Sequence, residues 1–374
     1  MVEWKTIGDI STNVFAGGTP STKHEEYYDG DIPWIRSGEI DFNTITKAER
    51  NITQEGYNNS SAKLIRKGSI VMAMTGATVA KSAILEFETS ANQSVCAIET
   101  DESIANYKYV YFYLSKDYFK IRSSAQGALT SLNLAMIKQL AIPIPSLEEQ
   151  TRIVGILDTF TSAIDNLKEQ IAQRRKQYEY YRDQLLDLEG KNGVERIILK
   201  NVCEVINGRA YSQPELLSEG KYRVLRVGNF FSNDSWYYSD LELEDKYYCQ
   251  QGDLLYAWSA SFGPHIWEEE KTVYHYHIWK MNCSDSLDKK FMFYWLQSED
   301  MRKQAFSNLH GATMAHLTKA LMESLMVPVL SLSKQQRIVS ILDTFEASIA
   351  NLEAQLELRE KQYEYYRNKL LTFE

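Results

Sequence analysis

The chain has 374 residues, of which 44% are hydrophobic, 24% charged and 12% aromatic. This composition excludes a disordered or collagen-like chain, and the length predicts two domains or slightly more. The formal net charge of −9 argues against binding nucleic acid through bulk positive charge, so any DNA contact must come from a folded, shaped surface. The sequence has neither a run of about 18 apolar residues nor an apolar signal-peptide core, and we expect a cytoplasmic protein.

Residues 1–145 predict a first globule that mixes strands and helices. A short apolar piece at residues 7–10 predicts a strand, and a loop with Gly17, Gly18, Thr19 and Pro20 follows it. A turn at Gly68 then leads into an apolar strand that ends near Met74. An aromatic-rich helix over residues 107–119 and a strand ending at Pro143 complete the pattern.

Residues 146–190 predict a long helix, because apolar residues recur there in alternating steps of four and three. The alternative is an amphipathic helix that packs on the core of its own domain, but the apolar stripe is only two residues wide, which is narrow for that role. Residues 153–188 would make a rod about 54 Å long. The predicted seam residues are Ile153, Leu157, Phe160, Ile164, Leu167, Ile171, Arg174, Tyr178, Tyr181 and Leu185.

Residues 191–330 repeat the outline of the first globule with different residues. A strand is expected at residues 199–202, followed by a loop that holds Asn207, Gly208 and Arg209. Arg226, with a glycine on either side at positions 220 and 228, matches Arg36 with Gly30 and Gly38 at a common offset of 190. The second globule also holds five of the six histidines.

Residues 331–374 predict a second long helix, and residues 331–373 align without a gap to residues 146–188. The offset is 185, and 25 of the 43 positions are identical. If the two helices pair antiparallel in one chain, Arg174 and Arg359 would each lie near the middle of the rod, facing the other helix. The second seam comprises Ile338, Leu342, Phe345, Ile349, Leu352, Leu356, Arg359, Tyr363, Tyr366 and Leu370.

The order of globule, helix, globule and helix resembles the specificity subunit of type I restriction-modification systems over the whole chain. The most specific matches are residues 140–153 with their second copy at residues 327–338, and residues 4–10 with the Gly-Gly-Thr-Pro loop. The second globule departs from the family pattern, because Asn207, Gly208, Arg209 and Ala210 stand in place of that loop. This departure leaves the contact roles of the loop open.

The resemblance implies an α+β fold with a pseudo-two-fold internal repeat. Two target-recognition domains, residues 1–145 and 191–330, would be separated by two helical spacers, residues 146–190 and 331–374, that pair as an antiparallel coiled coil. Each recognition domain would read one half of an asymmetric bipartite DNA site. Two modification subunits would methylate adenine and two restriction subunits would cut DNA with ATP. S-adenosylmethionine, ATP and magnesium would bind to those partners, and this chain would bind no cofactor.

The chain shows no convincing catalytic or metal site of its own. Residues 75–82 resemble a phosphate-binding loop but have Thr75 and Ala80 where glycines are needed. His275 and His277, with His265 nearby, allow a zinc site, base or phosphate contacts, or core packing, and strand alternation would place 275 and 277 on one face. The four cysteines form no Cys-x-x-Cys pair, which predicts neither a structural zinc site nor a disulfide framework.

For DNA contact we expect polar and aromatic loop residues, since arginine suits guanine, and asparagine or glutamine suits adenine. The alternative for each of them is a loop residue whose polar groups bond within the protein. Because Arg36 and Arg226 occupy matched positions in both globules, we favour for them a role in the common backbone frame or a contact with a phosphate. The first globule offers Thr19, Ser21, Lys23, Arg36, Ser37, Thr75, Lys81, Ser123, Ser124, Gln126, Thr130, Ser131 and Asn133. The second offers Arg209, Tyr211, Arg226, Asn229, Trp258, Ser259, Ser261, His265, His275, Asn308, His310, Thr313 and His316.

Tyr180 and Tyr365 occupy matched positions off the helix seam and suggest a contact with a modification subunit. Two other functions stay open from the sequence. One is a coiled-coil scaffold whose globules bind protein instead of DNA. The other is a bipartite specificity module that serves a different modification or defence enzyme.

Overall fold

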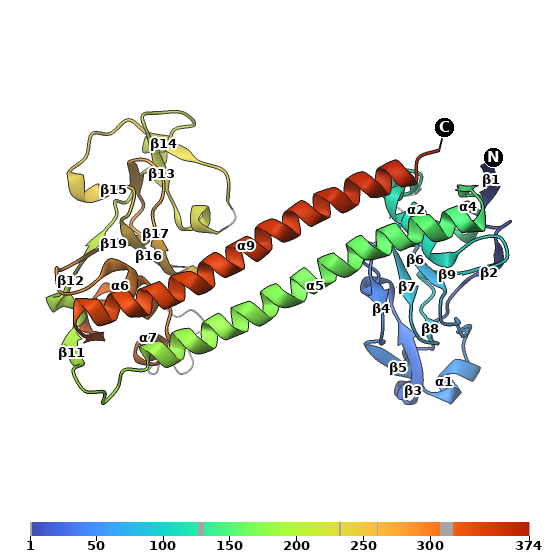
Figure 1. The fold of residues 1–374 in the computed structure, drawn as a ribbon, viewed down its shortest axis with the longest axis horizontal. Coiled ribbons are helices and arrows are strands. Elements are labelled where there is room, and N and C mark those ends of the chain that lie inside the picture. Colours follow the sequence, from blue (N-terminus) through green and yellow to red (C-terminus); the bar gives the residue numbers. More distant parts are fainter. Residues whose placement is uncertain (1, 126–130, 232, 260, 307–316, 374) are drawn as a thin grey trace. The chain divides into compact units, whose positions relative to one another are not determined.

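The computed structural model describes residues 2–125, 131–231, 233–259, 261–306 and 317–373 (Figure 1). The chain forms two compact units, and each contains one globule and part of both long helices. Unit 1 consists of Met1–Lys168 with Gln355–Glu374, and unit 2 of Glu169–Ala354. Because the units divide the long helices, they do not test the predicted four-segment boundaries, which stay a prediction.

Unit 1 is built on three small sheets whose apolar faces make its core. A two-stranded antiparallel ribbon joins β1 (Glu3–Thr6) to β10 (Ala141–Ile144). The five-stranded sheet has the order β2 (Ser11–Ala16), β9 (Val95–Thr100), β6 (Ile70–Ala73), β7 (Ser82–Leu85) and β4 (Thr44–Ile45). The third sheet has the order β5 (Arg50–Ile52), β3 (Tyr28–Ile35) and β8 (Ser90–Ala91).

The aromatic-rich segment of unit 1 forms helix α2 (Tyr107–Lys116). The side chain of Asn106 caps it by accepting hydrogen bonds from the backbone N–H groups of residues 108 and 109. Tyr109, Phe112 and Tyr113 are buried in the core beside the start of the first long helix. The other helices of the unit are α1 (Gln54–Asn58), α3 (Tyr118–Ser123), α4 (Leu134–Lys138) and the 3-10 turns η1 (Glu25–Tyr27) and η2 (Ser37–Glu39).

Unit 2 repeats this plan with two four-stranded sheets. A ribbon again joins its first and last strands, β11 (Glu195–Ile198) and β20 (Met326–Val329). One sheet has the order β12 (Cys203–Asn207), β19 (Ile278–Cys283), β16 (Leu254–Ser259) and β17 (Ser261–Ile266). The other has the order β14 (Tyr237–Ser239), β13 (Tyr222–Leu225), β18 (Thr272–Tyr274) and β15 (Tyr248–Cys249).

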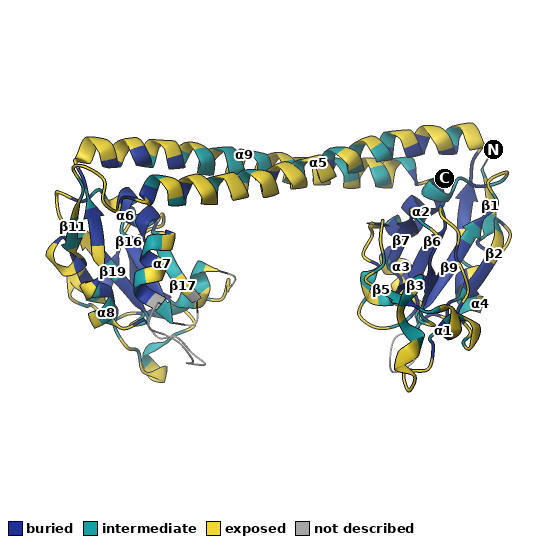
Figure 2. Ribbon diagram, turned by 90° about the horizontal axis from the view of Figure 1, so that it is seen from below, coloured by how far each residue is buried: buried dark blue, intermediate teal, exposed yellow. Residues whose placement is uncertain are grey.

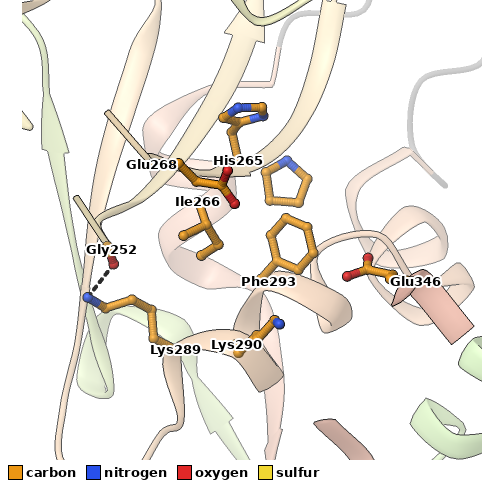
Figure 3. A pocket seen from close by; sticks show the side chains of 9 residues that line it. Gly252, His265, Ile266, Glu268, Lys289, Lys290, Phe293 and Glu346 are labelled. Atoms are coloured by element: carbon orange, nitrogen blue, oxygen red, sulfur yellow. Dashed lines mark hydrogen bonds between the residues drawn. The ribbon is translucent and has the colours of Figure 1, made fainter. Parts of the chain in front are cut away.

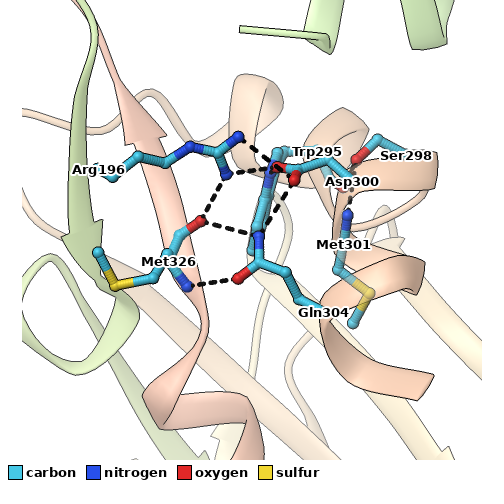
Figure 4. Close-up of polar contacts among 7 residues, drawn as sticks. All are labelled: Arg196, Trp295, Ser298, Asp300, Met301, Gln304 and Met326. Carbon is cyan, nitrogen blue, oxygen red and sulfur yellow. Dashed lines mark hydrogen bonds and ion pairs between the residues drawn. The ribbon is translucent and has the colours of Figure 1, made fainter. Parts of the chain in front are cut away.

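The ribbon of unit 2 is fastened to two helices by a polar network (Figure 4). Arg196 on β11 donates to Asp300 at 2.7 Å and to the Met326 carbonyl at 3.0 Å. The indole N–H of buried Trp295 donates to the same carboxylate at 2.9 Å. Among its described residues, the short helices of this unit are α6 (Lys289–Trp295), α7 (Glu299–Phe306), α8 (Lys319–Ser324) and the 3-10 turns η3 (Leu199–Asn201), η4 (Gln213–Glu215), η5 (Val227–Phe230) and η6 (Asp245–Tyr247).

The strands predicted at residues 7–10 and 199–202 are wrong. Residues 7–10 form a turn between β1 and β2, and residues 199–201 form η3 between β11 and β12. Ile7, Ile10 and Leu199 are fully buried. Their apolar character therefore indicates that they are buried. A run this short has too little periodicity to show whether the buried segment is a strand, a turn or a helix. By contrast, the predicted turn at Gly68 has a left-handed φ angle of 81° and leads into β6, and Gly252 in unit 2 likewise has a φ angle of 86° and leads into β16.

The two long helices are α5 (Leu147–Leu186) and α9 (Leu332–Leu370). They pack antiparallel within each unit. In unit 1 Phe160 stacks on Tyr366 with ring centroids 5.3 Å apart. In unit 2 Tyr181 stacks on Phe345 at 5.4 Å. The predicted α+β fold with paired long helices and an internal repeat is confirmed.

The seam residues are not all equally buried (Figure 2). Ile153, Leu157 and Leu342 are fully buried and belong to the globule cores, so the helix ends pack on their own domain as well as on each other. Tyr181 and Tyr366 remain exposed by 47% and 40%. Ile164, Ile171 and Ile338 are also buried, Arg359 is exposed, and the remaining members, Phe160, Leu167, Arg174, Tyr178, Leu185, Phe345, Ile349, Leu352, Leu356, Tyr363 and Leu370, are half-buried.

The seam arginine Arg359 does face the other helix. Its guanidinium lies 5.9 Å from the centre of the Phe160 ring on α5 and also donates to Gln362 at 3.0 Å. A cation over an aromatic ring is a favourable contact that needs no dry interior. None of the described helices is long and apolar enough to cross a membrane.

Candidate nucleic-acid interface

Arg36 and Arg226 begin the same turn in the two globules. Their backbone angles agree within one degree, at φ −116° with ψ 158° and 159°, and each precedes a 3-10 turn. The Arg36 N–H donates to the Glu39 carboxylate at 2.7 Å, and the Arg226 N–H donates to the Asn229 amide oxygen at 3.1 Å. The backbone of this position thus holds the same turn in both globules, and a contact of either arginine with DNA stays a prediction.

The side chains of the two arginines differ in their surroundings. Arg36 pairs with Glu49 at 2.6 Å, whereas the guanidinium of Arg226 lies 5.0 Å from the centre of the Tyr237 ring. Both are half-buried. One frame position therefore presents a carboxylate-paired cation in the first globule and an aromatic-stacked cation in the second.

The loop that follows β2 in the first globule takes the same path as the loop that follows β12 in the second globule. The N–H of Gly17 donates to the Val95 carbonyl at 3.0 Å, and the N–H of Gly208 donates to the Ile278 carbonyl at 3.1 Å. The N–H of the next residue also donates to a backbone carbonyl in both cases, from Gly18 to Ala91 at 2.8 Å and from Arg209 to Tyr274 at 3.1 Å. The second globule keeps the loop but adds a long cationic side chain.

In the first globule, several candidates from distant parts of the sequence meet at neighbouring loops. The Thr78 hydroxyl donates to the Ser37 carbonyl at 2.9 Å, and Lys81 pairs with Asp41. The N–H of residue 132 donates to the Met74 carbonyl at 2.9 Å, which places Ser131 beside the loop that begins at Thr75. These contacts bring the turn at Arg36, the β6–β7 loop and the segment before α4 together.

Thr19 and Arg36 line one hollow that also contains residues the sequence did not single out. These are Thr22, Glu25, Tyr28, Asp29, Trp34 and Arg50. Arg50 lies on β5 and Asp29 on β3, and neither carries a local motif. Only the pairing of β3 with β5 brings them to the loop, so the sequence offered no signal for them. Ser21 and Lys23 are exposed in the same loop.

Other candidates in the first globule use their polar groups within their own helices. The hydroxyls of Ser123 and Ser124 donate to backbone carbonyls of α3 at 2.8 Å and 2.7 Å. The amide oxygen of Asn133 caps α4 by accepting from the residue 136 N–H at 2.9 Å. Gln126 and Thr130 lie outside the described residues. A role for these residues in DNA contact stays a prediction.

In the second globule, Arg209, Tyr211 and His275 form a compact group. Arg209 pairs with Glu215 at 2.5 Å and lies over the Tyr211 ring at 5.0 Å. The Tyr211 and His275 rings stack with centroids 6.4 Å apart. The hydrogen bond from Arg209 lowers the pKa of Glu215 to about 2, and the Ser212 N–H and hydroxyl support the same shift. The guanidinium is thus held in a fixed place by a permanent carboxylate.

An aromatic group continues from His275 through His277 to Trp258. The His275 and His277 rings lie 4.9 Å apart, and the Trp258 ring lies 5.1 Å from His277 and stacks on Trp279 at 5.6 Å. The expected strand alternation of residues 274–277 is wrong, because β18 ends at Tyr274 and a turn follows. Tyr274 is fully buried and Tyr276 is 39% exposed.

Burial favours the neutral form of His275 and of His265. It lowers the pKa of His275 to about 4, with the neighbouring His277 and Arg226 acting in the same direction. Burial also lowers the pKa of His265, whose ring lies 4.6 Å from that of Phe230. Neutral imidazoles can both donate and accept hydrogen bonds, which suits contact with base edges.

The remaining candidates of the second globule are dispersed. Asn229 donates to the carbonyls of residues 233 and 235 and so holds its own loop. Ser259 is half-buried at the end of β16. Asn308, His310, Thr313 and His316 lie outside the described residues, and Ser261 is described by its backbone alone.

A pocket of unit 2 lies beside β17, α6 and α9 and gathers charged groups (Figure 3). Lys289 donates to the Gly252 carbonyl at 2.7 Å, and Lys290 pairs with Asp343 at 2.7 Å. Because both ammonium groups have partners inside the protein, we do not assign this pocket to DNA contact. No group of three or more His, Cys, Asp or Glu side chains among the described residues is arranged to hold a metal ion.

Tyr180 and Tyr365 are exposed by 61% and 59% on the two long helices. Each ring contacts the neighbouring seam tyrosine edge-on, with centroids 5.3 Å and 5.2 Å apart. The repeat therefore presents the same exposed aromatic pair once in each unit. The contact of these tyrosines with a modification subunit stays a prediction.

Comparison with known proteins identifies the class of protein to which these features belong. A family model described as type I restriction modification DNA specificity domain matches residues 1–174 and 191–359. The two matches cover most of the chain, and the chain belongs to this family. The resemblance seen in the sequence is confirmed.

Individual relatives carry the same description. The chain is 35% identical to the EcoR124I/EcoR124II specificity subunit of Escherichia coli over 195 residues, which span 49% of this chain and 48% of that protein. It is 27% identical over 394 aligned positions to a Haemophilus influenzae protein named as a type I restriction enzyme specificity subunit, S.HindORF215P, covering 100% of this chain and 96% of the relative.

A solved structure shares the fold. It comes from work on complex assembly and conformational transition of the type I restriction-modification system, and it matches with a TM-score of 0.66 at 17% identity. The match covers 99% of this chain and 97% of the other. At this identity the likeness shows a common architecture.

Proposed function

We propose that this chain is the DNA-reading subunit of a type I restriction-modification enzyme and recognises an asymmetric bipartite site. The observation that carries the proposal is the pair of globules with one backbone frame and different side chains at matched positions. Gly18 and Arg209 occupy one such position, and Arg36 and Arg226, in different surroundings, another. Two such readers in one chain suit two different half-sites.

In this proposal the chemistry belongs to partner subunits, and the chain itself is not an enzyme. Two modification subunits, which bind S-adenosylmethionine, would methylate adenine, and two restriction subunits would use ATP and magnesium to cut. The family membership supports this division, and the chain would act in the cytoplasm, where those partners meet DNA. The paired helices would set the unspecified spacer between half-sites, because a rigid rod fixes a distance better than a loop.

The exposed pairs at Tyr180 and Tyr365 are proposed to dock the modification subunits, because large exposed aromatic side chains are typical anchors of protein interfaces. Replacing both with alanine should reduce co-purification of the modification subunit. The folded state should be retained, since both rings are more than half exposed. Undiminished co-purification would remove this docking role.

The experiment that tests the proposed function is DNA retention by the complex. The chain is expressed with the neighbouring modification subunit, purified, and mixed with genomic DNA fragments and a non-specific competitor. Fragments retained above competitor should share one interrupted motif. Absence of retained DNA would favour a protein-binding scaffold, and a different co-purified large subunit would favour service to another modification or defence enzyme.

A further inference from the structure

Two matched glutamines join each globule to its long helix. Gln150 near the start of α5 and Gln335 near the start of α9 are fully buried. The Gln150 amide accepts from the Asn106 N–H at 2.8 Å and donates to the carbonyls of residues 104 and 145 at 3.1 Å and 2.9 Å. Each glutamine therefore ties three backbone groups together.

Gln335 makes the same three bonds in unit 2. Its amide oxygen accepts from the Asp288 N–H at 2.7 Å, and its NH2 group donates to the carbonyls of Ser286 and Leu330 at 2.8 Å and 2.7 Å. In both units one bonded carbonyl lies just before the long helix. The other bonded carbonyl and the bonded N–H lie in the segment that leads into the aromatic helix, which is α2 in unit 1 and α6 in unit 2. The amide thus bridges globule and long helix.

An ion pair about two turns further along each long helix is also duplicated. Lys108 of α2 pairs with Asp158 of α5 at 2.6 Å, and Lys290 of α6 pairs with Asp343 of α9 at 2.7 Å. Their side chains are between 35% and 44% exposed. Two polar contacts at separate points along one helix oppose both sliding and rotation of the globule, which apolar packing resists less specifically.

We infer that these contacts form a globule–helix clamp that restricts the complex to the one spacer length that the paired helices set. The clamp consists of Gln150 with the Lys108–Asp158 pair in unit 1 and of Gln335 with the Lys290–Asp343 pair in unit 2. The inference rests on the proposed function and deepens it, because it gives the clamp residues the role of positioning residues that act through the globule they hold. The surrounding loops differ between the globules, whereas this joint has the same chemistry twice.

The geometry of DNA makes such a joint necessary for a fixed spacer. Neighbouring spacer lengths differ by about 3.4 Å of rise and, at about 10 base pairs per turn, by roughly 36° of rotation. A globule that rocked on its helix by a comparable amount would meet its half-site at the wrong spacing. Buried amide bonds are directional and costly to leave unmade, so they hold one orientation.

The test measures methylation by the complex on a plasmid library in which the two half-sites found for the wild type are separated by every spacer from three shorter to three longer. Methylation is read from long single-molecule sequencing. Wild type should mark one spacer length. Gln150→Met, which keeps the size but removes the bonds, should raise the share at neighbouring lengths about tenfold with both half-site sequences unchanged. Arg152→Met, half a turn away and bonded to Glu149 of its own helix, is the matched control and should behave as wild type.

A charge exchange provides the independent arm. Lys108→Asp or Asp158→Lys alone should broaden the accepted spacers, and the two together should restore the narrow choice, which a merely structural residue would not do. Because the side chains of this pair are about one third exposed, these variants should fold even if Gln150→Met does not. In that case the Lys108 and Asp158 variants alone decide whether the clamp restricts the spacer. An unchanged single spacer in the charge-reversed variants would overturn the clamp. A wild type that marks no interrupted motif would instead overturn the proposed function.

Discussion

At the scale of single residues, Gly17 shows how closely the loop at residues 17–20 approaches the neighbouring backbone. A Cβ atom added to Gly17 would lie 2.2 Å from the Ala91 carbonyl oxygen, and one added to Gly208 would lie 2.3 Å from the His275 oxygen. Both obstacles are backbone atoms, which cannot rotate away. The family-typical glycine at this place therefore has a steric cause that holds in both globules, although their next residues differ.

Gly17→Ala should destabilise unit 1 by about 1 to 3 kcal/mol, the usual cost of forcing extra volume into a packed site. The matched control is Gly38→Ala, because a Cβ there meets no atom within 4 Å. Urea unfolding followed by tryptophan fluorescence checks this, since the indole N–H of Trp34 donates to the Gly18 carbonyl at 3.0 Å. Equal unfolding midpoints for the two variants would contradict the close approach.

His275 predicts a pH dependence of stability. Its pKa of about 4 lies below the ordinary value of 6.5, so the folded state favours the neutral ring. The stabilisation is complete above pH about 6.5 and is lost as the pH falls toward 4. His275→Asn should therefore flatten the fall of the unfolding midpoint over this range. An equally steep fall in the His275 variant would contradict burial as the cause.

At the scale of elements, the polar network around Asp300 connects the terminal ribbon of unit 2 to its helices. The carboxylate accepts from both Arg196 and Trp295. Gln304 on the same helix bonds to both the N–H and the carbonyl of Met326. Strand β20 leads directly into α9, so this network positions the start of the second long helix.

Asp300→Ala should destabilise unit 2 by about 1 to 3 kcal/mol, because it leaves the buried Trp295 indole N–H without its acceptor and removes the ion pair of Arg196. Hydrogen exchange at the β11 and β20 amides should quicken. The neighbouring Glu299→Ala removes only an exposed pair with Lys303 and should cost less than about 0.5 kcal/mol. Unchanged ribbon exchange in the Asp300 variant would show that apolar packing alone holds it.

The sequence predicted the long helices well and the short elements less well. The seam of α5 and α9 repeats for about five heptads, and such a sustained period indicates a long helix. Residues 7–10 and 199–202 are too short for periodicity to separate a turn from a strand. The hollow beside Thr19 was missed because Asp29 and Arg50 meet through strand pairing that no local pattern records.

At the scale of the whole molecule, each unit repeats one plan of ribbon, sheets, capped aromatic helix and long helix. Asn106 and Asp288 cap the two aromatic helices, and the two buried glutamines bond beside those caps. The side chains at the loop ends differ between the units. A duplicated frame with diverged loops is what a reader of two unlike half-sites requires.

The most direct test of this account is the N6-methyladenine pattern of cells that carry this chain with its modification subunit, compared with cells from which only this chain is deleted. Long-read sequencing detects the modified bases. The account predicts that deletion removes one asymmetric, interrupted motif, whose two halves and spacer are thereby defined. An unchanged pattern, with both proteins confirmed as expressed, would contradict the assignment of this chain as the DNA reader.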